Sequence, residues 1–205
     1  MNKTKKAMCL FSIVLLFVLC AMGQLSIAAA KSRVILARNP GAINEHNQAD
    51  GFDSRERLTK IVAGSASKII NRASLKCAEG DLVASLLLKN HIGSLIPEDM
   101  PKCHDDPDFL AGVCARPSIK NKTILNMVSG LRGTYRRGVP WYWGGIILGV
   151  DTLAVETTAL AVMNEKRALK KVAPRPVPKY VKIAEKKFNL GTTDAAKIEQ
   201  IKNDL

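Results

Sequence analysis

Apolar and polar positions in the middle of the chain recur at the spacing of a helix. Between Ser54 and Lys76, apolar residues follow one another at steps of three and four, which places them on one face of an α-helix. The same spacing predicts helices over 81–96, which stops before Pro97, and over 118–132. Three amphipathic helices with short connections predict a small helical bundle within residues 54–137. No run of alternating apolar and polar residues is long enough to predict a sheet, so the predicted fold class is all-α.

An almost unbroken apolar stretch occupies residues 7–22 near the N-terminus. Lysines precede it, and the small residues Ala28-Ala29-Ala30 follow it. This arrangement is typical of a secretory signal peptide, so we predict a leader over 1–30 and entry into the export pathway. A segment of about 20 apolar residues also suffices to cross a bilayer, which leaves an uncleaved signal anchor as the alternative. Residues 31–53 are polar and aperiodic, and they predict a flexible arm.

A second apolar stretch covers residues 138–163. It begins with an aromatic cluster at 141–143 and is followed by basic residues, as at the two ends of a membrane-spanning helix. Its acidic residues Asp151 and Glu156 would each cost about 2.5–3.5 kcal/mol near the centre of a bilayer. The segment therefore predicts a marginal transmembrane helix, and a buried apolar helix of a water-soluble domain is the alternative.

Four residues of this stretch would share one face of such a helix, at 100° per residue: Gly145, Gly149, Thr152 and Glu156. The two glycines form a small-xxx-small pair, which lets a second helix approach closely. Glu156 on the same face would then meet that neighbour rather than lipid. The pattern predicts a helix-packing face for a partner in the membrane.

The remaining residues, 164–205, form a basic tail. Pro174, Pro176 and Pro178 predict an extended linker, which is followed by short helices over 180–188 and 193–205. Basic residues beside a membrane segment are attracted to anionic headgroups. The whole predicted architecture is thus a helical bundle, one apolar helix and a basic helical tail.

Charge and composition narrow the choice of partner. Lys plus Arg number 31 against 18 Asp plus Glu, for a net charge of +13. A nucleic-acid-binding protein gathers its basic residues on one face of a recognisable fold, whereas here they are scattered on both sides of the second apolar stretch. We therefore expect membrane lipid, other membrane proteins or a second copy of the chain as partners, and no nucleic acid.

The cysteines left after removal of the predicted leader are Cys77, Cys103 and Cys114. An exported protein can form disulfides, and Cys103 and Cys114 bracket a short loop, which favours a bond between them and leaves Cys77 over. The ligand types at 103–106 are too few for zinc and lack the loop that calcium requires. No complete catalytic or nucleotide-binding motif is present, so we expect neither an enzyme nor a cofactor or metal.

These observations predict a non-enzymatic, membrane-anchored assembly protein of the secretory pathway or cell envelope. If 138–163 does not span a membrane, the protein would instead be secreted. A second interpretation starts from the dibasic pairs Arg136-Arg137 and Lys166-Arg167, which flank the apolar stretch. Cleavage after Arg137 and Arg167 would release a short apolar peptide, as from the precursor of a secreted membrane-active toxin.

Overall fold

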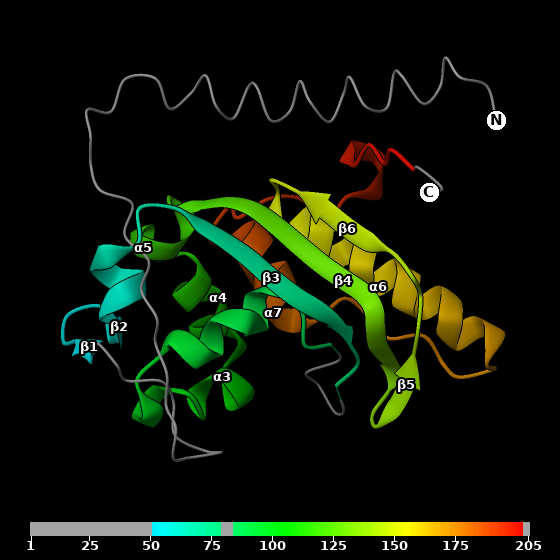
Figure 1. Cartoon of the computed structure of the whole chain (residues 1–205), viewed down its shortest axis with the longest axis horizontal. Coiled ribbons are helices and arrows are strands. Elements are labelled where there is room, and N and C mark those ends of the chain that lie inside the picture. The colour runs from blue at the N-terminus through cyan, green and yellow to red at the C-terminus, as the bar shows by residue number, and fades with distance from the viewer. Residues whose placement is uncertain (1–50, 79–83, 203–205) are drawn as a thin grey trace. The chain divides into compact units, whose positions relative to one another are not determined.

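The computed structural model describes residues 51–78 and 84–202. This part of the chain forms a four-stranded mixed sheet with helices packed along one of its faces (Figure 1). The long central strand β4 pairs in parallel with β3 along one edge and antiparallel with β5 and β6 along the other. The strands of this sheet are β3 (Ile69–Lys76), β4 (Thr123–Arg136), β5 (Val139–Trp141) and β6 (Ile146–Gly149).

The remaining elements precede β3, connect β3 to β4 or follow β6. A small antiparallel pair of strands and a π-helical turn precede β3, and a run of short helices connects β3 to β4. They are β1 (Phe52–Asp53), β2 (Leu58–Thr59), η1 (Ile61–Ser65), α2 (Leu87–Asn90), η3 (His91–Ser94), η4 (Pro97–Asp99), α3 (Lys102–Asp105), α4 (Pro107–Cys114) and α5 (Pro117–Lys120). After β6 come α6 (Thr152–Leu169), α7 (Lys179–Lys186) and η5 (Ala195–Lys197).

The all-α prediction is wrong, because strands occupy much of the segment read as a helical bundle. In β3, Asn71, Ala73 and Leu75 are buried while the residues between them are exposed, which is the period of a half-buried strand. Asn71 conceals this alternation in the sequence because it is polar at an inward position. Its Nδ2 donates to the carbonyl oxygen of Leu87 at 3.1 Å, and its Oδ1 accepts from Asn90 at 2.8 Å.

The other two predicted bundle helices are also corrected. Residues 81–96 contain only the single turns α2 and η3 within their described part, and 118–132 becomes the end of α5 followed by β4. The predicted helix at 180–188 corresponds to α7. In the described part of 193–205, by contrast, the helix is limited to η5.

The predicted transmembrane helix over 138–163 is wrong as well. This stretch holds β5, β6 and the first two-thirds of α6, and the hairpin turn before β5 uses Gly138 at φ 71°. Asp151 begins α6, because its carboxylate accepts the Ala154 N–H at 2.9 Å, as a helix N-cap does. Within 51–78 and 84–202, no helix has both the length and the apolar character needed to cross a membrane.

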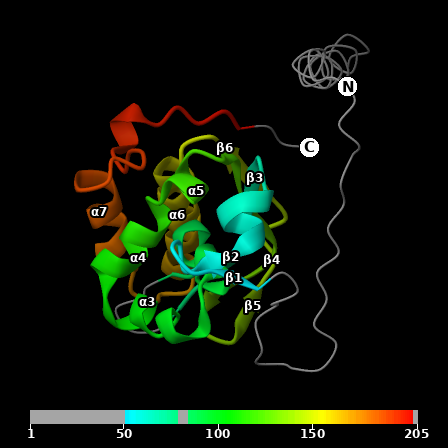
Figure 2. The ribbon, with the colours of Figure 1, turned by 90° about the vertical axis from the view of Figure 1, so that its left-hand side faces the viewer.

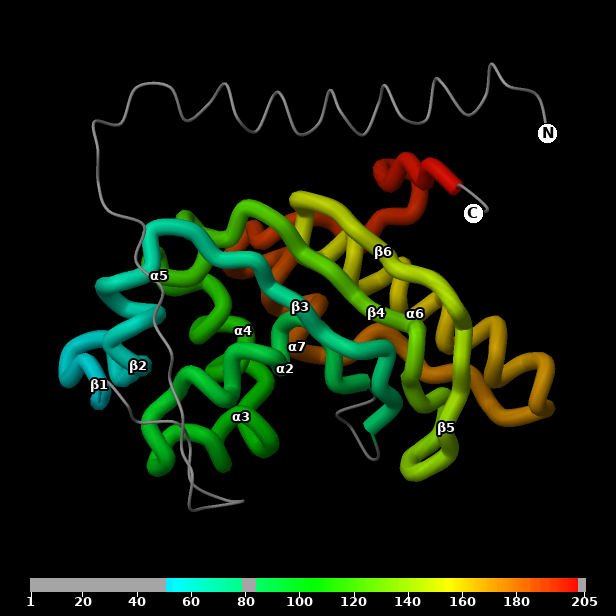
Figure 3. The backbone as a smooth tube through the Cα atoms, viewed as in Figure 1, coloured from blue at the N-terminus to red at the C-terminus, as the bar shows by residue number. Residues whose placement is uncertain are grey.

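Two apolar clusters form the core. One lies between the sheet and α6, and it includes Ala73, Leu75, Val128, Ala159 and Met163. The other lies among α2, α4 and α7, where the Tyr180 hydroxyl donates to the carbonyl oxygen of Ala84 at 3.0 Å. The backbone tube shows β6 turning directly into α6, which runs along β4 (Figure 3).

The predicted signal peptide over 1–30 and the predicted arm over 31–53, apart from its last three residues, lie outside the described residues. Of those three, Phe52 and Asp53 form β1.

Candidate functional site

The sheet has two faces of different character. Residues directly opposite one another on paired strands point to the same side. The strand register therefore places three rows on the face that points away from α6: Ile70 with Leu125, Arg72 with Met127 and Leu148, and Ser74 with Ser129 and Ile146. We call these eight residues the outer face. The inner face is formed by the alternate positions, such as Ala73, Val128 and Ile147, which belong to the cluster under α6.

The outer face is open to solvent although its middle is apolar. Ile70 is 59% exposed, Leu148 56% and Ile146 49%, while Val128 on the inner face is fully buried. Figure 2 shows the reason, since α3, α4, α6 and α7 lie on one side of the ribbon and β3, β4 and β6 on the other. A contiguous exposed apolar patch is uncommon on monomeric proteins and marks an interaction site.

The same sheet carries basic residues and no acidic ones. Its strands contain Arg72, Lys76, Arg132 and Arg136. They belong to two longer segments, 57–78 and 109–150, neither of which contains Asp or Glu. Four basic residues that are distant in the sequence therefore lie together on a sheet without acidic residues.

Aromatic and apolar side chains continue the exposed surface at the break between β5 and β6. Tyr142 is 68% exposed and Trp143 38%. A Cβ added at Gly130 or at Gly145 would overlap the Trp143 ring. These two positions alternate with Ser129 and Ile146 of the outer face, so the indole packs on the opposite side of the sheet. Leu131, opposite the break in β4, is 55% exposed.

The four residues predicted to share one helix face do not lie on one helix. Gly145 is in the break between β5 and β6, and Gly149 is the last residue of β6. Only Thr152 and Glu156 belong to α6. Each of the four contacts its own domain: a Cβ at Gly149 would lie 2.7 Å from Val155, and the Thr152 hydroxyl is 3.3 Å from Asn126 Oδ1.

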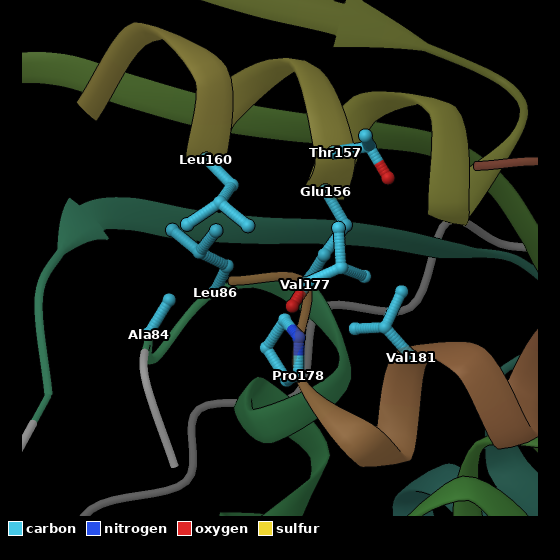
Figure 4. A pocket seen from close by; sticks show the side chains of 8 residues that line it. All are labelled: Ala84, Leu86, Glu156, Thr157, Leu160, Val177, Pro178 and Val181. Carbon is cyan, nitrogen blue, oxygen red and sulfur yellow. The ribbon is translucent and has the colours of Figure 1, made fainter. Parts of the chain in front are cut away.

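Glu156 points into the core and holds the start of α2. Its Oε2 accepts the backbone N–H groups of Leu87 at 2.7 Å and Leu88 at 3.2 Å, whereas Oε1 has no hydrogen-bond partner among the described residues. Figure 4 shows this side chain reaching from α6 toward Val177 and Pro178. The space between the side chains drawn there is too small for a water molecule. Burial raises the pKa of Glu156 to about 7, and the two N–H groups oppose that rise.

A larger cavity, of about 180 Å³, lies beside η3 and the start of α6. His91, Cys114, Thr123 and Thr152 are among the side chains that line it, and no carboxylate is. Burial lowers the pKa of His91 to about 4, so its imidazole is neutral at neutral pH. The lining offers hydroxyl and apolar contacts, and it has no acid to pair with the imidazole for general acid–base chemistry.

The predicted disulfide between Cys103 and Cys114 is wrong, because both residues are buried free thiols. The Cys114 thiol donates instead to the carbonyl oxygen of Leu88 at 3.3 Å. Burial raises the pKa of Cys103 to about 11 and that of Cys114 further still. In the neighbouring acidic stretch, Asp106 caps α4 by accepting the Phe109 N–H at 3.0 Å. Across the described residues, no three His, Cys, Asp or Glu side chains are grouped to hold a metal ion.

The two dibasic pairs lie in different environments. Arg136 and Arg137 are exposed at the hairpin between β4 and β5. Arg167 is only 5% exposed, and it donates to the carbonyl oxygens of Tyr135 and Ala173, both at 2.7 Å. A protease would have to open α6 to cut after Arg167, so the folded protein gives the toxin-precursor interpretation no support.

Sequence reasoning missed the outer face, although a signal for it exists. Alternation in Ile69–Lys76 and the absence of acidic residues over 109–150 are both visible in the sequence. Neither signal shows which segments pair, and it is the pairing of β3 with β4 that brings these residues together on one sheet. Comparisons with protein-family models, with curated proteins and with solved structures find no significant match to this chain.

Proposed function

We propose that this protein is a non-enzymatic binding protein whose interface is the outer face of its sheet. The observation that supports the proposal is the exposure of Ile70, Ile146 and Leu148, on a face that the described helices leave uncovered. Covering apolar surface stabilises a complex by about 25 cal/mol per Å². An open aliphatic face is therefore a natural place for a partner to bind.

The ionisable groups of the outer face and of the core favour binding over catalysis. The ionisable residue of the outer face is an arginine, which remains protonated and does not act as a general base. Glu156 and His91, which have a raised and a lowered pKa, are both enclosed by the core. Their burial accounts for the shifts without a catalytic role.

Thiol labelling tests whether a partner covers this face in the cell. Ser74 is exposed in the third row of the outer face, beside Ser129 and Ile146, and Ala168 is exposed on α6, away from the sheet. We expect maleimide to label both the S74C and the A168C variants of the purified chain. In fresh lysates of cells that express the protein, maleimide should label S74C at least about tenfold more slowly than A168C, because the partner covers the outer face. Equal labelling of the two variants in the cell extract would overturn the proposal.

A further inference from the structure

We infer that the outer face docks on an anionic lipid surface. This inference rests on the proposed function, to which it adds the class of partner. It follows from three features of the described residues: exposed aliphatic side chains on β3 and β6, a sheet with only positive charge, and an exposed tyrosine beside the apolar rows. A membrane surface presents the matching layers, with anionic headgroups above hydrocarbon.

The positions of the cations fit a surface that is both apolar and anionic. Arg72 is exposed, and it lies in one row with the apolar residues Met127 and Leu148. Long basic side chains reach phosphates while their stems stay in apolar surroundings. Lys76 and Arg132 extend the positive charge along the same strands. Because the two sheet-forming segments contain no acidic residue, nothing there repels an anionic headgroup.

An exposed tyrosine adds a second, independent element. Tyr142 is 68% exposed at the break that leads directly into Ile146. Such side chains combine an apolar ring with a polar tip, and they are enriched at the level of the headgroups.

Two other occupants fit the charge pattern less well. A second copy of the chain would bring an equally acid-free sheet against the first, so the cations of both would repel one another. A nucleic acid would match the charge, and Tyr142 offers one ring for stacking, but its phosphates and sugars would not bury the aliphatic side chains of Ile70, Ile146 and Leu148 as hydrocarbon does.

Vesicle flotation of the full chain tests the inference. We compare vesicles of phosphatidylcholine with vesicles in which about a third of the lipid is phosphatidylglycerol. Binding should be strong only to the anionic vesicles and should fall at high salt. Each removed cation should weaken binding about fivefold, so the R72Q/K76Q variant, which removes two exposed cations on the same side of β3, should bind about 30-fold more weakly. The I146S/L148S variant, which removes the exposed aliphatic side chains of β6, should lose at least about tenfold.

Matched controls separate the outer face from the rest of the chain. K170Q/K171Q removes two exposed cations and L169S one exposed apolar side chain, all at the end of α6 and off the sheet. These variants should bind like the parent chain, and unchanged circular dichroism should show that every variant is folded. The predicted leader is the same in all of them, so differences between variants report on the replaced residues.

The possible results decide between the two proposals. Equal binding to both kinds of vesicle, or equal losses in outer-face and control variants, would overturn docking on anionic lipid. If vesicles do not bind while S74C stays protected in cell extracts, the outer face is an interface and its partner is not a lipid surface. If vesicles do not bind and S74C is unprotected as well, both proposals fail.

Discussion

Two buried groups have pKa values shifted in opposite directions, and replacing either one should reveal the effect of the other. Burial raises the pKa of Glu156 from 4.5 to about 7 and lowers the pKa of His91 from 6.5 to about 4. At about 1.4 kcal/mol per pKa unit, each shift corresponds to about 3 kcal/mol in the free energy of unfolding. Glu156 accepts the first N–H groups of α2 and His91 is the C-cap of that helix, and we treat the two effects on the free energy of unfolding as additive.

The signs of the two contributions are opposite. The folded protein binds the Glu156 proton more tightly than the unfolded chain does. The stability from this group is therefore complete below pH 4.5 and is lost as the pH rises to about 7. The folded protein binds a proton on His91 less tightly, so its contribution is complete above pH 6.5 and is lost as the pH falls to about 4. Between pH 4.5 and 6.5 the two changes cancel.

Urea unfolding at half-unit steps from pH 4.5 to 7.5 measures this cancellation. The parent protein should show a nearly flat stability profile over most of that range. The Glu156→Gln variant keeps an acceptor for the two N–H groups of α2, and its stability should rise by about 3 kcal/mol up to pH 6.5. The His91→Gln variant should instead lose about 3 kcal/mol up to pH 7. Asp99, whose pKa is lowered by Arg57, loses its contribution only below its ordinary pKa of 3.8, outside the range.

Exposed residues of the same types provide the controls. Glu165 on α6 and His104 in α3 are both exposed, so Glu165→Gln and His104→Gln should leave the profile flat. Parallel profiles for the parent, Glu156→Gln and His91→Gln proteins would refute the reasoning, whatever their absolute stabilities. A sloping profile in the parent that only one replacement removes would show that the other group is not shifted.

Three further predictions concern packing. Arg167→Leu removes the donor to two part-buried carbonyl oxygens and should cost about 1–3 kcal/mol in urea unfolding, whereas exposed Lys170→Leu should change stability by less than about 0.5 kcal/mol. Gly133→Ala places a Cβ against the backbone of β3 and should cost more than about 2 kcal/mol by the same assay, whereas Gly64→Ala, with open space around it, should not. The Cys114 thiol should react with maleimide only after denaturation, as judged by peptide mapping, and reaction in the folded protein at the unfolded rate would contradict its burial.

The extent to which the sequence predicts this fold differs from segment to segment. The predicted helix at 180–188 corresponds to α7. Its amphipathic pattern belongs to a single short element, so local spacing alone is enough to predict it. The pattern over 54–76 misleads, because apolar residues of η1 and of β3 happen to continue one another at helical steps. The buried Asn71 hides the alternation further, since its amide is satisfied by groups 16 and 19 residues away.

The stretch 138–163 shows a second limit of local reading. An exposed sheet edge and a buried helix follow each other here, and together they resemble one long apolar segment. Pro140 and Gly144-Gly145 interrupt any helix in its first half, and Asp151 is a good N-cap for a helix that starts later. These signals were present, but the apolar composition outweighed them. The outer face depends on the pairing of β3 with β4, more than 50 residues apart, which no local pattern specifies.

The bond between Tyr180 and Ala84 has a consequence for how the chain acquires its structure. It joins groups 96 positions apart, and Glu156 reaches back 69 positions to α2. A nascent chain that has not yet been synthesised through α7 lacks both the hydroxyl and the helix that complete the second cluster. We therefore expect folding to wait for the end of translation, and to be slow for a domain of this size. Fragments truncated before α7 should be recovered as protease-sensitive, loosely ordered material.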